Sequence, residues 1–243
     1  MPDTTVTYTG KDHIARITLN RPEAENFINQ QLAQEIADIC QRVNQDDNIY
    51  VVVITGAGDR VFCGGSEVKM NVASAVASID RPVIAAINGD ALGEGLELAL
   101  SCDIRLASDQ ARFGLPQLTS GVIPMNGGTQ RLPRLIGKGK ALELILTGEI
   151  INCAEAFEIG LVSKVVPQKS LAVEVETLAR KIASQAPVSL RFIKEAVNKG
   201  MDLTLEQGLR LEADLYLLLH TTADRTEGIT AFLEKRTPEF RGE

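Results

Sequence analysis

Two short, uninterrupted apolar segments, residues 50–55 (YVVVIT) and 82–88 (PVIAAIN), constrain the fold more than any other feature of the sequence. Neither shows the alternation with polar residues that marks a strand with one solvated face, so both are typical of strands covered on both faces. Both end at glycines, and a helical segment at 93–100 and a further strand at 102–107 follow the second. Strands that alternate with helices predict an α/β fold with crossover connections.

The rest of the chain divides into an N-terminal hairpin and a helical C-terminal part. Polar and apolar residues alternate over 6–9 and 13–19, which predicts paired strands, and apolar residues three and four apart over 29–43 predict a helix. The helices expected after residue 127 cover 129–135, 141–146, 154–159, 171–183, 188–198, 205–219 and 224–235. The segment 205–219 is rich in leucine, which either packing within the chain or a partner subunit would cover.

Composition excludes several classes of protein. With 25 basic and 32 acidic residues the formal charge is −7, which argues against a nucleic-acid partner. No apolar stretch approaches the roughly 20 residues that cross a bilayer, and residues 1–5 do not begin a secretory signal. We therefore expect a cytoplasmic protein with no membrane partner. The 4 cysteines lack metal-binding spacing and only 2 histidines are present, so we expect neither disulfides nor a metal site.

Two glycine-rich loops, residues 62–69 (FCGGSEVK) and 88–98 (NGDALGEGLEL), each leave a strand. Glycine lets the backbone turn sharply and approach a ligand, and the unpaired N–H groups at the start of a following helix can bind an anion. The second loop matches a dinucleotide fingerprint only in part, because Leu98 stands where a third glycine belongs. Residues 121–129 lack the motif of a phosphate-binding loop. NAD binding and phosphoryl transfer are therefore rejected.

Seven segments, in order along nearly the whole chain, resemble the enoyl-CoA hydratase/isomerase (crotonase) family. They are 19–24 (LNRPEA), 63–69 (CGGSEVK), 85–99 (AAINGDALGEGLELA), 102–107 (CDIRLA), 113–116 (FGLP), 127–132 (GGTQRL) and 231–236 (AFLEKR). The resemblance implies a crotonase-like spiral of ββα units with the active site in residues 1–185. It also implies a C-terminal helical region for oligomerisation in residues 186–243, which would form a homotrimer or a dimer of trimers.

The resemblance also implies a shared chemistry on a coenzyme A thioester. In the family, one backbone N–H from each glycine loop binds the thioester oxygen, and these donors fall on Ser66 and Glu94 here. Gly65, Gly93 and Gly95 would line the substrate beside them. Negative charge builds up on this oxygen when water adds to a conjugated double bond, so two preorganised donors favour the reaction. Coenzyme A is then part of the substrate, and no permanently bound cofactor is expected.

Glu97 falls on the family's catalytic acid/base, which activates water. The alternative is a carboxylate that only stabilises the start of a helix, worth about 0.3–1 kcal/mol. Hydratases of the family usually carry a second glutamate after the FGLP segment, and this chain has Gln117. An amide can hold water but cannot exchange a proton at neutral pH. The carboxylates of Glu94 and Glu67 either supply the missing proton or face water at the mouth of the site.

Two lysines are candidates for the phosphates of coenzyme A. Lys69 follows the first glycine loop, and Lys235 lies in a segment that in relatives reaches the cofactor of a neighbouring subunit. Solvated surface lysines are the alternative. The sequence as a whole predicts an enoyl-CoA hydratase, with a single-glutamate isomerase, a decarboxylase or a thioester hydrolase as alternatives. An acyl-CoA-binding subunit with impaired catalysis is the alternative of another class.

Overall fold

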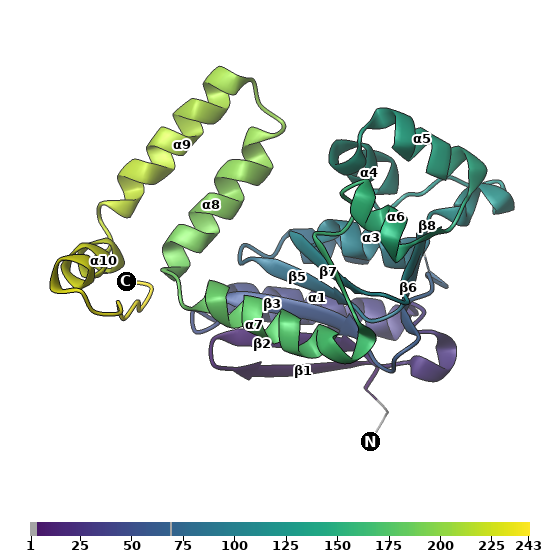
Figure 1. Cartoon of the computed structure of the whole chain (residues 1–243), viewed down its shortest axis with the longest axis horizontal. Coiled ribbons are helices and arrows are strands. Elements are labelled where there is room, and N and C mark those ends of the chain that lie inside the picture. Colours follow the sequence, from purple (N-terminus) through teal and green to yellow (C-terminus); the bar gives the residue numbers. More distant parts are fainter. Residues whose placement is uncertain (1–3, 69) are drawn as a thin grey trace.

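The computed structural model describes residues 4–68 and 70–243 and contains two β-sheets, with a helical arm at the C-terminus (Figure 1). The larger sheet has six strands in the order β1-β2-β3-β5-β7-β10. They are β1 (Val6–Lys11), β2 (Ile14–Leu19), β3 (Val51–Gly56), β5 (Val83–Ile87), β7 (Ile104–Ser108) and β10 (Lys164–Val166). Strands β1 and β2 are antiparallel and the other neighbours are parallel, which confirms the predicted hairpin and the α/β class.

The smaller sheet has four very short strands in the order β4-β6-β8-β9. They are β4 (Val61–Cys63), β6 (Asp90–Leu92), β8 (Arg112–Gly114) and β9 (Ile151–Asn152). Strands β4, β6 and β8 each follow a strand of the larger sheet, so the chain winds as a spiral from long strand to short strand to helix. These strands were not predicted, because two or three residues are too few to show a period.

The central strand β3 is buried on both faces, as its unbroken apolar sequence predicts. Val52 and Ile54 face the core that contains helix α1 (Gln30–Gln45), whereas Val51 and Val53 face helix α7 (Leu171–Ala183) on the other side. This is the two-residue period of a strand with a hydrophobic layer on each face.

Helix α3 (Glu94–Ser101) is short and lies inside the first of these cores. All seven residues from Gly95 to Ser101 are buried, and most of them are apolar. Glu97 is the exception, because its carboxylate sits at 0% exposure in this otherwise hydrophobic helix. A buried carboxylate needs hydrogen-bonding partners or it destabilises the fold, and those partners define the site described below.

The other helices surround the spiral or continue beyond it. They are α2 (Val72–Ala77), α4 (Gly128–Ile136), α5 (Lys138–Thr147), α6 (Cys153–Glu158), α8 (Pro187–Gly200), α9 (Leu205–Leu219) and α10 (Ala223–Glu234), with 3₁₀ turns η1 (Pro22–Ala24), η2 (Pro116–Ser120) and η3 (Gln168–Ser170). All the helices predicted after residue 127 are present, with ends displaced by a few residues at most. Helix α2 was not predicted.

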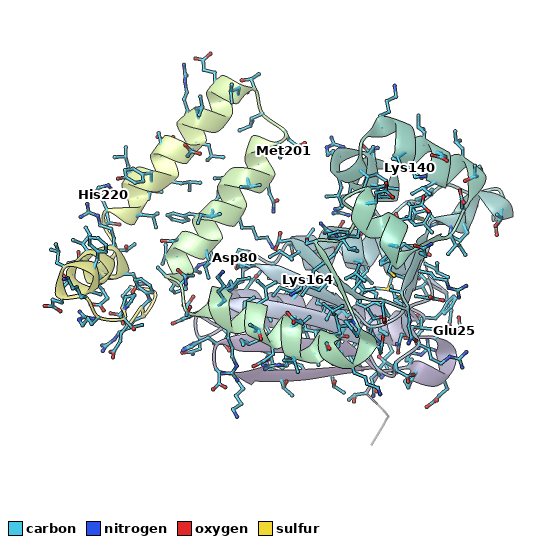
Figure 2. The ribbon with its side chains drawn as sticks, viewed as in Figure 1. Glu25, Asp80, Lys140, Lys164, Met201 and His220 are labelled. Carbon is cyan, nitrogen blue, oxygen red and sulfur yellow. The ribbon has the colours of Figure 1, made fainter. Side chains whose placement is uncertain are left out.

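The arm formed by α8, α9 and α10 extends away from the sheets, with α8 and α9 side by side (Figure 1). Met201 follows the last residue of α8, and His220 follows α9 (Figure 2). The ring of His220 lies edge-on to that of Tyr216. The arm leaves large apolar side chains in contact with water, for example Phe232 at 80% and Leu205 at 79% exposure. Within the described part of the chain, no helix combines the length and the apolar character that crossing a membrane requires.

Candidate active site

The first glycine loop follows β4 and is attached to the segment before α1. The Ile28 N–H donates to the Gly65 carbonyl at 2.9 Å, and the Glu67 N–H donates to the Ile28 carbonyl at 2.9 Å. Ser66 lies between these two bonds and forms a parallel bridge with Ile28. The described residues provide no hydrogen-bond partner for the Ser66 N–H. The loop thus holds this donor in a fixed position without using it.

The second glycine loop follows β6 and begins helix α3. Gly93 has φ 54° and ψ −125°, a conformation that residues with a Cβ rarely adopt. Gly95 packs directly on the carbonyl oxygen of Cys63 in β4, and no Cβ fits between them. Helix α3 can therefore start only where these two glycines stand, close against the first loop.

The two loops meet as predicted. A Cβ on Gly93 would lie 4.0 Å from the Gly65 Cα and 3.7 Å from the Gln117 Nε2, so the two backbones lie close together beside the Gln117 side chain. The Glu94 N–H is in the first turn of α3, where no helical carbonyl precedes it, and no partner for it is found among the described residues. Ser66 and Glu94 therefore offer two unused backbone donors from neighbouring loops.

Glu97 lies one turn into α3, and three groups hold its carboxylate. Its Oε1 accepts hydrogen bonds from the N–H of Asn126 at 2.7 Å and of Gly128 at 2.8 Å. Its Oε2 accepts one from the Gln117 side-chain Nε2 at 3.3 Å. Oε1 has then used both of its lone pairs, whereas Oε2 keeps one for a further donor. The site thus holds a fixed carboxylate with one free acceptor position.

The N–H groups of Asn126 and Gly128 were not predicted as part of the site. In the sequence, the segment 127–132 indicates only the family resemblance. Gly127 has φ 107°, and this turn brings both N–H groups around to the same oxygen. Gly127 and Gly128 were the sequence signal that could have predicted these donors, because turns at paired glycines before a helix gather backbone N–H groups around an anion.

The pKa of Glu97 is raised from its ordinary value, and burial is the main cause. The hydrogen bonds from Gly128 and Asn126 act in the opposite direction. The nearby negative charge of Glu94 raises the pKa further, and the positive charge of Arg131 lowers it. A raised carboxyl pKa brings the group nearer to neutral pH, where it can both accept and donate a proton.

Gln117 stands in η2, directly after the short strand β8. Its Nε2 faces the Glu97 carboxylate, which fixes the orientation of the amide, because the opposite orientation would place two acceptors together. Its Oε1 is buried and has no partner among the described residues. The structure thus brings Glu97 and Gln117 together, as the sequence predicts.

The two other carboxylates considered from the sequence lie in different surroundings. The Glu94 Oε2 is 3.7 Å from the position that a Cβ of Gly65 would take, so this half-buried side chain lies over the meeting point of the loops. Glu67 is exposed and pairs with Arg21 at 3.1 Å. Glu94 therefore lies at the site, whereas Glu67 lies at its edge and is ion-paired with Arg21.

Of the two candidate phosphate-binding lysines, the structure describes only Lys235, and Lys235 does not reach the site within the single chain. Lys69 lies outside the described residues. Lys235 is exposed and ends α10 on the arm, which Figure 1 shows apart from α3. A role for Lys235 would therefore need a second subunit. The described residues contain no cluster of three or more His, Cys, Asp or Glu side chains that would suit a metal ion.

The chain is thus an α/β protein built as a spiral of ββα units, and it buries one carboxylate beside two glycine loops. The family described as enoyl-CoA hydratase/isomerase matches residues 9–243. An enoyl-CoA hydratase structure from Bacillus anthracis superposes with a TM-score of 0.95, at 41% identity over 98% of this chain and 100% of that one.

Curated relatives agree with this match. The crotonyl-CoA hydratase of Syntrophomonas wolfei is 40% identical over 95% of each chain. The (E)-benzylidenesuccinyl-CoA hydratase of Thauera aromatica is 42% identical over 98% of this chain and 99% of its own. The chain belongs to the enoyl-CoA hydratase/isomerase family, and the predicted crotonase-like fold is confirmed.

The contact between Gly95 and Cys63 generates a prediction about stability. Gly95→Ala forces a Cβ against a backbone carbonyl, so we expect a loss of about 1–3 kcal/mol of unfolding free energy. Gly139→Ala is the matched control, because Gly139 lies in α5 with open space around it and should gain about 0.4–1 kcal/mol. Urea denaturation of both variants measures this, and equal stabilities would contradict the packing described.

Proposed function

We propose that this chain adds water to the double bond of a 2-enoyl-CoA, with Glu97 as the catalytic residue that activates the water. The chain is an enzyme of the hydratase type, as its relatives are. This proposal rests mainly on the Glu97 carboxylate, which is fully buried. Two backbone N–H groups hold its Oε1, and its Oε2 can accept a hydrogen bond from one more donor. A water molecule that donates to Oε2 is oriented for attack on the β-carbon of the substrate.

The N–H groups of Ser66 and Glu94 are the proposed oxyanion hole. Attack on the β-carbon moves a pair of electrons onto the thioester oxygen, and donors placed there in advance stabilise the enolate. Removing a single donor of this kind costs about 2.7–4 kcal/mol in measured cases. Support comes from the closeness of the two loops and from the unpaired state of both donors among the described residues. Because these donors belong to the backbone, the side chain of Glu94 does not interrupt them.

The proton balance can be completed with a single carboxylate. Glu97 removes one proton from the water as the oxygen bonds to the β-carbon, and the enolate forms. The protonated Glu97 then returns that proton to the α-carbon, which gives the 3-hydroxyacyl-CoA. Gln117 exchanges no proton and is the residue proposed to orient the water. Two observations support this role: its Oε1 has no partner among the described residues, and its Nε2 bonds to Glu97.

Coenzyme A enters only as part of the substrate in this proposal. Lys69 and Lys235 are the proposed contacts for its phosphates, Lys235 from a neighbouring subunit. A homotrimer or a dimer of trimers is supported by the apolar surface of the arm, and we place the boundary between the catalytic and oligomerisation regions at residues 185 and 186. A cytoplasmic location accords with the four free cysteines of the chain.

Double-bond isomerisation is the second candidate, and Gln117 favours it. An isomerase needs one group that removes a proton at one carbon and returns it at another, which a single carboxylate can do beside an oxyanion hole. Incubation with crotonyl-CoA and with a 3-enoyl-CoA separates the two, because only a hydratase forms 3-hydroxyacyl-CoA. Tight binding of thioesters without turnover or exchange of α-protons would favour a binding subunit instead.

Glu97→Gln tests the role of the carboxylate. The variant keeps the size of the side chain and removes the base, so kcat for crotonyl-CoA hydration should fall by about 10²- to 10⁴-fold. Glu67→Gln is the matched control, because it removes an exposed carboxylate at the edge of the same site and should leave kcat nearly unchanged. Undiminished turnover in Glu97→Gln would show that Glu97 is not the base that activates the water.

The pH dependence provides a separate test. Glu97 acts as a base when ionised, so the rate rises as the pH passes upward through its pKa. Glu94→Gln removes a negative charge that raises this pKa, and the rise should therefore move to lower pH. Profiles of kcat/KM for the parent, Glu94→Gln and Glu67→Gln measure the shift. A collapse of the rate in Glu94→Gln at every pH would instead make Glu94 the second proton donor.

The oligomer is tested through the arm. Phe232→Asp places a charge on a side chain that is 80% exposed in the single chain, so the monomer should tolerate it and a trimer built on this surface should not. Light scattering should give three or six chain masses for the parent and a smaller mass for the variant. Val173→Asp on α7, at 67% exposure, is the control that should keep the parental mass.

A further inference from the structure

The turn that holds the Glu97 carboxylate, residues 126–128, is itself held by a side chain from the helix that follows it. Arg131 lies in the first turn of α4, and its Nη1 donates to the Asn126 carbonyl at 2.9 Å. A Cβ on Gly127 would lie 2.1 Å from this Nη1 and 3.0 Å from the Cζ, so the guanidinium group packs directly on the Gly127 backbone. Arg131 therefore fixes the same turn whose N–H groups bind the Glu97 Oε1.

The position of Arg131 is unfavourable for a cation. The start of a helix carries the positive end of the helix dipole, which favours acidic side chains, and α4 has none in its first turn. Burial lowers the pKa of the guanidinium group, and the negative charge of Glu97 is the main effect in the opposite direction. A charge that is placed at such a cost is explained if Glu97 requires it.

Glu97 has few charged neighbours among the described residues. Arg131 on α4 is the cation that lowers its pKa, and Glu94 on α3 is the anion that raises it. The other elements packed against α3 add little charge. Helix α2 has no titratable side chain, Cys63 of β4 keeps its proton because burial raises its thiol pKa to about 12, and Asp90 of β6 is ion-paired on the smaller sheet.

The charge of Arg131 matters because the other influences on Glu97 act against its use as a base. Burial is the largest effect on the Glu97 pKa and raises it, and Glu94 adds to this effect. Both therefore favour the protonated carboxyl group, which cannot accept a proton from water. A positive charge at the neighbouring turn favours the ionised form.

We propose that Arg131 is a positioning residue for the catalytic base, because it holds the 126–128 turn against Glu97 and supplies the positive charge that keeps this carboxylate ionised. The inference rests on the proposed role of Glu97 in hydration. Arg131 packs on the backbone of the turn and acts through Glu97, not through a contact with the substrate.

Arg131→Gln tests the charge, since it leaves a polar side chain at this half-buried position. Without the charge the pKa of Glu97 rises, so the carboxylate ionises at higher pH. The rising limb of kcat/KM against pH should move in the same direction. At a pH on that limb, kcat/KM for crotonyl-CoA should fall about tenfold and should recover toward the parental value at higher pH. A limb that stays at the parental pH would overturn the proposal.

Two further variants separate the charge from a merely structural role. Arg131→Lys keeps the charge, so its limb should stay close to the parental one, and a limb displaced as far as in Arg131→Gln would contradict the proposal. Arg134→Gln is the matched control, because Arg134 is exposed on the same helix and faces Asp202 at 3.6 Å, so kcat/KM should not change. If Arg131→Gln does not fold, Arg131→Met removes the same charge and replaces it in the comparison.

A titration without substrate distinguishes this inference from the proposed function. The infrared band of the protonated Glu97 carboxyl group is the one that Glu97→Gln loses, and its titration should move to higher pH in Arg131→Gln. If the parent does not hydrate crotonyl-CoA, the proposed function is refuted, and this titration still decides whether Arg131 acts on Glu97. Hydration with an unmoved limb and an unmoved band would refute only the inference.

Discussion

The pair of hydrogen bonds from the Asn126 and Gly128 N–H groups to the Glu97 Oε1 is the interaction on which the rest of the site depends. A carboxylate inside a hydrophobic helix would otherwise destabilise the core, and these bonds offset that cost. They also connect α3 to the turn before α4, so one contact joins two successive parts of the spiral. Because Oε1 is fully used, Oε2 is the oxygen that can accept a further hydrogen bond.

The glycines of the two loops set the geometry around this carboxylate. Gly95 lets α3 start against β4, and Gly93 turns the chain so that the Glu94 N–H lies close to the first loop. The spiral places these loops together because β4 and β6 are neighbours in the smaller sheet. The packing of the smaller sheet therefore also positions the proposed donors, and a change that loosens the sheet would displace them.

The sequence predicted those parts of the structure whose residues repeat with the period of a helix or strand, form an apolar run or match a motif of the family. The buried strands around Val52 and Ile84 were predicted from apolar runs, and Glu97 with Gln117 from the resemblance. The strands of the smaller sheet were not predictable, because their few residues have no pattern of their own and pair only through the fold. The role of the Asn126 and Gly128 N–H groups was not predicted, because the glycines at 127 and 128 indicate a turn but do not show which group its N–H donors bind.

The use of backbone donors at Ser66 and Glu94 has a consequence for how such a site can diverge. Every residue except proline carries the same N–H, so these positions can exchange side chains without loss of the proposed donors. Glu94 is an instance, because it brings a carboxylate to the meeting point of the loops while its N–H remains in the first turn of α3. A site built this way separates its proposed donors from the side chains around them, so a substitution at either position can change the lining of the site while the donor stays in place.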